Sequence, residues 1–174
     1  MAKPVIPIKA KLFIGVIANS DDVLNQAERI IEKKFGKIDY KTKKIPFSHT
    51  EYYSYMGSNL FKVFFSFHRL FKREDIVVIK LLANKLEKKI SGNEKRRVNI
   101  DPGYLTLSNV YLATCKDFFH RVYIGRGVYL ENEYKYVGKN FQPWEWTYPD
   151  YRKHEYLDFF YNMRKLYRKQ IKEG

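Results

Sequence analysis

Residues 11–18 read Lys-Leu-Phe-Ile-Gly-Val-Ile-Ala, a short apolar run that is rich in β-branched side chains. Its length and composition predict a buried β-strand. Ser20 then offers a helix N-cap, and Asp21 and Asp22 supply the negative charge that favours a helix start. Apolar residues at helical spacing continue to Gly36, where a helix is expected to stop. This strand–helix opening favours an α+β or α/β fold.

The rest of the chain alternates strand-like and helical patterns. Residues 37–47 and 60–70 predict strands, although the second stretch is also compatible with a helix. Residues 74–90 repeat apolar side chains every three to four positions, which predicts a helix, and a tyrosine-rich loop is expected at 49–57. Further strands are expected at about 97–107, 109–116, 119–125 and 127–137, with a tight turn at 125–127 and a closing helix from Lys153.

These patterns predict one α+β domain over residues 1–174, with its core at 11–172. We expect a mostly antiparallel sheet, helices packed on it, and a C-terminal helix that closes the core. A chain of 174 residues is long enough for one such core.

The chain is strongly basic, with 33 Lys and Arg against 19 Asp and Glu and a net charge of +14. The excess is concentrated in residues 37–97, whereas residues 98–152 are balanced. A positive field of this kind attracts polyanions, chiefly nucleic acid. Because most of the basic residues are lysines, a purely solvating role is the alternative.

Several features bear on the compartment. No apolar run is long enough to span a bilayer, and the first ten residues contain no apolar signal-peptide core, so no membrane partner is expected. Cys115 is the sole cysteine, which excludes an internal disulfide and favours the cytoplasm. Cys115 ends an apolar strand and is interpreted as a small core residue rather than a nucleophile.

Polar side chains gather among aromatic ones between Arg96 and Arg152, a mixture that is typical of ligand sites. Asp101 precedes Pro102 and Gly103, which predicts a turn in which its carboxylate bonds a backbone N–H. The functional alternative is a general base or metal ligand, with Asn99 on the same strand face.

The densest polar cluster follows shortly after. Lys116, His120 and Arg121 together suit a phosphate-like group, with His120 as acid or base near neutral pH. The alternative is ordinary surface polarity, in which Lys116 pairs with Asp117.

Two further groups of residues have competing explanations. Asp150 and Arg152 lie before the last helix. Asp150 either caps this helix or starts the turn before it, whereas Arg152 and the neighbouring tyrosines would instead close over a planar or anionic ligand. Glu131 and Glu133 alternate along a strand, so they either face solvent or hold Mg²⁺ together with Asp101 or Asp150. Zinc-type spacing of histidines and cysteines is absent, so no metal site is predicted.

Nearly the whole chain resembles a bacterial family catalogued as a domain of unknown function, DUF 4416, whose members are often labelled GTP-binding. The resemblance is carried by Lys11–Val16, Tyr52-Tyr53, Met56-Gly57, Ile79-Lys80, Asn84, Leu86-Glu87, Asn99–Leu105, Leu112–Thr114, Lys116-Asp117, His120-Arg121, Tyr123, Gly125, Gly127 and Thr147–Tyr151. It implies one complete domain but no reaction, cofactor or catalytic residue. The chain itself has neither a Gly-x-x-x-x-Gly-Lys-[Ser/Thr] phosphate loop nor a Gly-x-Gly-x-x-Gly motif.

The leading hypothesis is a cytoplasmic protein that binds an anionic ligand, a nucleotide or RNA. His120 and Asp101 are the candidate catalytic residues, and phosphoryl or phosphodiester chemistry is expected if the protein is an enzyme. The candidate ligand-binding residues are Asn99, Lys116, Arg121, Asp150 and Arg152. No cofactor can be named. The alternatives are a non-catalytic RNA- or protein-binding module that uses the basic surface, and an assembly subunit without a ligand.

Overall fold

The structure, a computed structural model, describes residues 1–47, 53, 56–57, 59–92 and 95–173. Within these residues nine strands form one sheet with antiparallel pairing throughout, and three α-helices pack on it. The α+β fold, the mostly antiparallel sheet and the C-terminal helix are therefore confirmed. Most of the tyrosine-rich segment 49–57 lies outside the described residues.

The main path of the sheet runs in the order β2-β4-β1-β5-β6-β8-β7, with β3 beside β4 and β9 beside β8. The strands are β1 (Ala10–Ala18), β2 (Ile38–Lys41), β3 (Ile45–Pro46), β4 (Phe61–Phe71), β5 (Val98–Leu105), β6 (Asn109–Thr114), β7 (Val122–Gly125), β8 (Val128–Val137) and β9 (Asn140–Pro143). The helices are α1 (Asp21–Phe35), α2 (Ile76–Ser91) and α3 (His154–Glu173), with short 3₁₀ helices η2 (Arg73–Asp75) and η3 (Pro149–Arg152).

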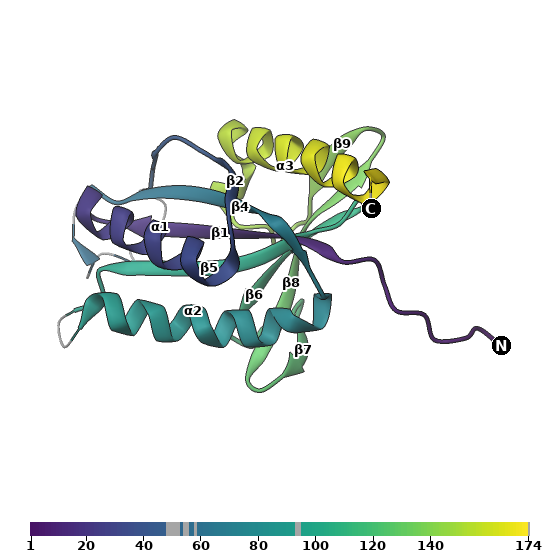
Figure 1. Cartoon of the computed structure of the whole chain (residues 1–174), viewed down its shortest axis with the longest axis horizontal. Helices are drawn as coiled ribbons and strands as arrows, with labels where there is room; N and C mark the ends of the chain where they lie inside the picture. Colours follow the sequence, from purple (N-terminus) through teal and green to yellow (C-terminus); the bar gives the residue numbers. More distant parts are fainter. Residues whose placement is uncertain (48–52, 54–55, 58, 93–94, 174) are drawn as a thin grey trace.

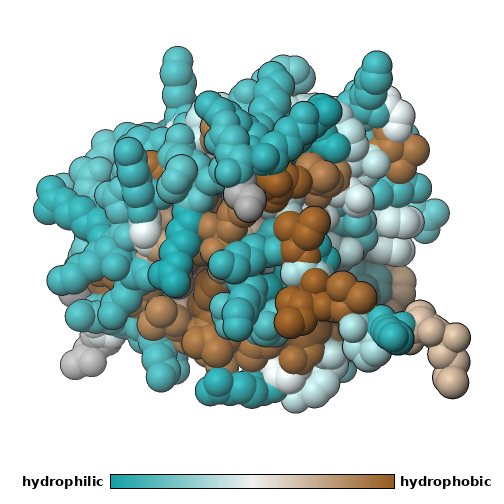
Figure 2. All heavy atoms as spheres, turned by 45° about the vertical axis from the view of Figure 1, so that its right-hand side comes forward, coloured by the Kyte–Doolittle hydropathy of each residue, from teal (hydrophilic) through white to brown (hydrophobic). Residues whose placement is uncertain are grey.

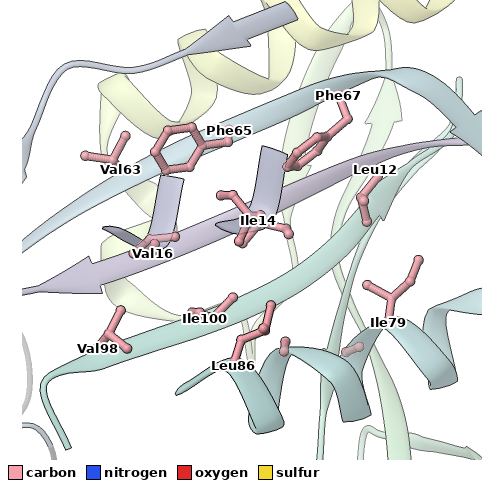
Figure 3. Packing of buried hydrophobic residues seen from close by; sticks show 14 of the residues in the cluster. Leu12, Ile14, Val16, Val63, Phe65, Phe67, Ile79, Leu86, Val98 and Ile100 are labelled. Atoms are coloured by element: carbon pink, nitrogen blue, oxygen red, sulfur yellow. The ribbon is translucent and has the colours of Figure 1, made fainter. Parts of the chain in front are cut away.

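The sheet is covered on both faces, by α1 and α2 on one side and by α3 on the other (Figure 1). On the first face, alternate side chains of β1, β4 and β5 pack against the apolar stripes of α1 and α2 (Figure 3). Ile14 and Ile100 are fully buried there. On the second face α3 packs through Tyr156, Phe160 and Met163, which are also fully buried. This two-sided burial explains why β1 is apolar except at Lys11, whose buried ammonium group is paired with Asp39.

The residues predicted to begin and end helix α1 and to form the tight turn at 125–127 have these roles in the structure. The Ser20 side chain accepts a hydrogen bond from the Val23 N–H and caps α1, and Gly36 ends α1 with a positive φ of 101°. The two-residue turn at Arg126 and Gly127, both with positive φ, joins β7 to β8. The segment 60–70 is a strand, not a helix.

Two strand predictions need correction. Residues 37–47 form two short strands instead of one, because the chain leaves β4 after Thr42 and pairs with it again at Ile45. β9 was not predicted, because Phe141 is the only apolar buried side chain in its four residues and no alternation is visible.

The turn predicted at Asp101-Pro102-Gly103 is also wrong, because these residues lie within β5. Gly103 is required there for a steric reason: a Cβ atom at this position would overlap the Phe13 ring and the Tyr111 carbonyl oxygen. The glycine therefore lets β5 approach both of its neighbours, β1 and β6.

β5 and β6 separate immediately beyond this glycine. They pair only from Gly103 to Leu105, and Pro102 has no N–H to continue the ladder. The backbone N–H and C=O groups of successive residues in a strand point to alternate sides. The backbone groups of Ile100 and Val98 therefore point to the same unpaired edge as Pro102. The Ile100 N–H donates instead to Glu87 Oε1 at 2.6 Å, and the Val98 carbonyl accepts from Arg96 Nε at 3.1 Å. Side chains thus replace the missing strand.

The surface is mainly hydrophilic on the face shown in Figure 2, and separate hydrophobic patches interrupt it. Among the residues that the structure describes, no helix is both long and apolar enough to cross a bilayer.

The close approach at Gly103 predicts a large stability cost for any side chain. Gly103→Ala should lower the free energy of unfolding by about 3 kcal/mol, because a buried backbone or ring has to move. Urea unfolding measures this change. Gly138→Asn is the matched control, since its neighbourhood is open and asparagine tolerates a positive φ. Equal stability of the two variants would contradict the steric role of Gly103.

Candidate functional site

A cavity of about 780 Å³ lies where β5 and β6 separate. α2 contributes one face to its wall, at the helical spacing 80, 84, 87, 88 and 91, and residues 148–151 contribute another part. The basic side chains in the wall are Lys62, Lys80, Lys88, Arg96 and Lys116, and the carboxylates are Glu87, Asp101 and Asp150. The basic groups therefore outnumber the acidic ones by two.

A hydrogen-bonded chain of charged and polar groups forms the α2–β5 side of the cavity. Lys80 Nζ lies 3.0 Å from Asp101 Oδ1, and Asn99 donates to the other oxygen of Asp101. Arg96 donates to Asn99 and lies 2.7 Å from Glu87 Oε2. The expectation that Asn99 and Asp101 share a strand face is thus confirmed.

The electrostatics of this side keep the Lys80–Asp101 pair ionised. Burial opposes the charge on Asp101, but the charge and hydrogen bond of Lys80 outweigh it and hold the pKa of Asp101 below its usual 3.8. Burial likewise opposes the charge on Lys80, yet the charges of Asp101 and Glu87 raise the Lys80 pKa. Asp101 is consequently a poor proton acceptor and a good orienting group.

A second buried ion pair also lines the cavity. Lys62 Nζ lies 3.0 Å from Asp150 Oδ2, which also accepts a hydrogen bond from the Tyr156 hydroxyl at 3.2 Å. The Lys62 ammonium lies 4.5 Å from the centre of the Tyr151 ring. Tyr151 is almost fully buried and lines the cavity, and its hydroxyl has no hydrogen-bond partner among the described residues.

The segment after β6 forms another part of the wall. Cys115 lines the cavity and is exposed, so the prediction of a buried core cysteine is wrong. β6 ends at Thr114, one residue earlier, and the Asn84 amide donates to the Cys115 sulfur at 3.3 Å. The thiol is therefore accessible from the cavity side and tied to α2.

His120 and Arg121 belong to a separate, largely buried cluster. His120 Nε2 lies 2.8 Å from Glu131 Oε1, and Arg121 Nε donates to Glu131 Oε2 at 2.8 Å. The His120 ring stacks on Trp146 with centroids 5.2 Å apart, and its side chain is only 5% exposed. Arg121 also donates to the Tyr148 hydroxyl at 2.8 Å. The cluster touches the cavity through Tyr148, which lines it.

The structure therefore brings together four of the seven residues that the sequence suggested. Asn99, Asp101, Lys116 and Asp150 line the cavity. His120, Arg121 and Arg152 do not line the cavity. Arg121 contacts the lining residue Tyr148, and Arg152 donates to the Trp144 carbonyl at 2.8 Å. The Asp150 side chain binds Lys62, so the interpretation that it caps α3 is wrong. The interpretation that Asp150 starts the turn is confirmed, because its carbonyl accepts from the Lys153 N–H within the turn before α3. Catalytic roles for Asp101 and His120 stay predictions.

Glu131 and Glu133 are both buried, so the interpretation that they face solvent is wrong. Glu131 is paired with His120 and Arg121, whereas neither carboxylate oxygen of Glu133 has a hydrogen bond of good geometry within the described residues. In the same part of the chain no three carboxylate, histidine or cysteine side chains are arranged to hold a metal ion.

The sequence interpretation missed Lys62 and Lys80, the two buried lysines of the cavity. Lys62 lies between Phe61 and Val63 in a strand, and Lys80 follows Ile79 on the buried stripe of α2. A lysine at a position that the apolar pattern marks as buried was the available signal, since lysine is rarely buried without a partner. The partners, Asp150 and Asp101, are distant in sequence and could not be assigned.

The family model described as Domain of unknown function (DUF4416) matches residues 8–167. The chain belongs to this family. Every residue that lines the cavity lies within the part of the chain that the family model matches. Searches of curated proteins and of solved structures found no match.

Glu133 predicts a specific pH dependence of stability in this DUF4416 protein. Burial, and then the neighbouring charge of Glu131, raise the pKa of Glu133 well above its usual 4.5. The folded protein then retains a proton that the unfolded chain releases, so this contribution to stability is complete below pH 4.5 and is lost as the pH rises toward the raised pKa.

Glu133→Gln removes this ionisation and should therefore reduce the loss of folding stability that occurs as the pH rises. Urea unfolding should show the variant to be the more stable protein at about pH 8, with the difference shrinking toward acidic pH. Glu145→Gln, at an exposed position, is the control and should run parallel to wild type. A parallel course for Glu133→Gln as well would show that Glu133 keeps an ordinary pKa.

Proposed function

We propose that this protein binds a small anionic ligand, a nucleotide or another phosphate-bearing molecule, in the cavity between β5, β6 and α2. The observation that carries the proposal is the pair of buried lysines, Lys62 and Lys80, in the wall of one cavity. Burying an ammonium group is costly, and proteins retain such groups where their charge is used.

Both lysines keep donors for a ligand. An ammonium group has three N–H donors, and within the described residues each of these two groups donates to one aspartate. An anion in the cavity would accept the remaining hydrogen bonds. Lys88 and Lys116 add positive charge to the same wall. Charge-assisted bonds of this type are the ones that hold phosphate and carboxylate groups.

The rest of the wall suits the other part of a nucleotide-like molecule. Phe47, Tyr53, Tyr148 and Tyr151 offer aromatic surface, and the Tyr151 hydroxyl is available for a hydrogen bond. A volume of about 780 Å³ falls in the range of about 300–1,000 Å³ that is usual for small-molecule sites. The exposed thiol of Cys115 suits the reducing cytoplasm, which we include in the proposal.

The proposal is limited to binding. Asp101 has a lowered pKa and both of its oxygens are occupied, while His120 is stacked and bonded behind the wall. Phosphoryl or phosphodiester chemistry would need a proton acceptor that faces the ligand and whose charged form is less strongly stabilised than that of Asp101. The polar network therefore supports orientation of a ligand.

Cys115 provides a direct test, because the sequence contains no other cysteine. The probes are inorganic phosphate, pyrophosphate, ribose 5-phosphate, GMP and GTP, with guanosine and ribose as neutral controls. At a concentration of about ten times Kd, a bound ligand should slow alkylation of Cys115 by iodoacetamide about tenfold, because about one site in ten stays open. Glutathione alkylation in the same mixtures corrects for direct effects. Unchanged rates with every anionic probe would contradict the proposal.

Removal of a buried ion pair gives a second test. Lys80→Met with Asp101→Asn removes one lysine of the cavity without leaving an unpaired buried charge. Affinity for the best anionic probe should fall about tenfold or more, as expected for a lost charge-assisted hydrogen bond. The matched control is Lys11→Met with Asp39→Asn, which removes a pair with a 2.5 Å separation outside the cavity. Calorimetric titration that shows equal affinities in both double variants would reject the role of Lys80.

A further inference from the structure

Two large aromatic side chains stand exposed beside the cavity wall. Phe118 and Phe119 are 56% and 81% exposed, and they follow Lys116, which lines the cavity, by two and three residues. Their ring centroids are 5.1 Å apart. Tyr123, on the neighbouring edge strand β7, is 59% exposed. Two adjacent exposed aromatic rings, such as those of Phe118 and Phe119, mark an interaction surface more often than chance exposure does.

These rings are held in place by the cluster behind the cavity wall. Phe118 and Phe119 pack edge-on against the His120 ring, with centroids 5.3 Å and 4.8 Å away. Arg121 donates to the Lys116 carbonyl at 3.0 Å and to the Tyr148 hydroxyl at 2.8 Å, which joins this segment to a wall residue. The exposed rings are thus pre-positioned at the cavity, which lowers the entropic cost of stacking a ligand on them.

Basic side chains lie near the rings, and one acidic residue, Asp117, directly precedes Phe118. Lys85, Lys88 and Lys89 are exposed on the cavity-forming half of α2, and the Asn84–Cys115 hydrogen bond joins this helix to the segment that carries the rings. Arg126 is exposed in the turn that ends β7. The chain as a whole has a net charge of +14. Phosphates therefore meet complementary charge here, whereas a second copy of this chain would bring like charge.

We propose that the ligand is the end of a single-stranded nucleic acid. The terminal nucleotide occupies the cavity, the next bases stack on Phe118, Phe119 and Tyr123, and the backbone phosphates face the lysines of α2. Aromatic platforms beside basic residues are the chemistry that binds single strands without sequence preference. This inference rests on the proposed function, because it takes the same cavity as the site of the terminal nucleotide.

The test compares ligands of increasing length at one fixed, low salt concentration. Calorimetric titration with UMP and with 5′-phosphorylated oligouridylates of about two, four and six nucleotides should show affinity rising about tenfold for each of the first stacked bases. Phe118→Ala with Phe119→Ala should reduce the affinity for the longer strands toward that for UMP and leave UMP binding unchanged. Val137→Ala, which also truncates an exposed apolar side chain, is the control and should leave every affinity as in wild type.

A circular single strand tests whether an end is needed. A circular oligonucleotide has the same bases and phosphates as the linear strand but no terminus, so it should bind more weakly than the linear strand. Equal binding of the two forms would overturn the inference, as would oligouridylates that bind no more tightly than UMP.

The outcomes separate this inference from the proposed function. UMP binding without any length dependence leaves the cavity proposal intact and removes the nucleic-acid partner. Absence of binding by UMP and by every anionic probe removes the proposed function itself. Sedimentation analysis tests whether a second copy of this chain occupies the rings instead. If the Phe118→Ala, Phe119→Ala variant loses self-association but keeps wild-type affinity for the strands, the rings form a contact between copies. The inference is then wrong.

Discussion

β5 has a strand partner on only one side beyond Gly103, since Pro102 cannot donate the next hydrogen bond to β6. An open strand edge inside a protein leaves backbone groups that need other partners. Glu87 and Arg96 supply them, at Ile100 and Val98. The separated strands, the charged side chains that line them and the cavity between them all follow from this interruption of one ladder.

Charge buried at this opening has to be balanced, and the structure balances it in pairs. Lys80 with Asp101 and Lys62 with Asp150 place two cations and two anions in the wall of a cavity that also holds Arg96 and Glu87. Removing one partner of such a pair is expensive, whereas an intact pair still offers donors to a ligand. The pairs therefore neutralise the buried charge of an interrupted sheet, and in the proposed function their remaining donors would bind the anion.

The His120 cluster contributes through position. Glu131 holds His120 and Arg121, and Arg121 reaches both Tyr148 in the cavity wall and the backbone of the segment that carries Phe118 and Phe119. The buried Glu131 carboxylate on β8 thereby holds both the wall residue Tyr148 and the segment with Phe118 and Phe119 in position. Membership of the DUF4416 family places this whole arrangement, from β1 to most of α3, inside one family domain.

The sequence by itself determined the elements whose signals are local: the apolar run of β1, the cap at Ser20, the stripes of α1 and α2, and the turn at Arg126 and Gly127. It also indicated that polar residues between 96 and 152 gather, and four of the seven candidates do line the cavity. Only the tertiary structure decided that Asp101 lies in a strand, that Glu133 is buried, and that Lys62 and Lys80 complete the cavity wall. The physical reason is that burial and ion pairing depend on partners 21 or 88 residues away along the chain, whereas turns, caps and periodicity depend on near neighbours.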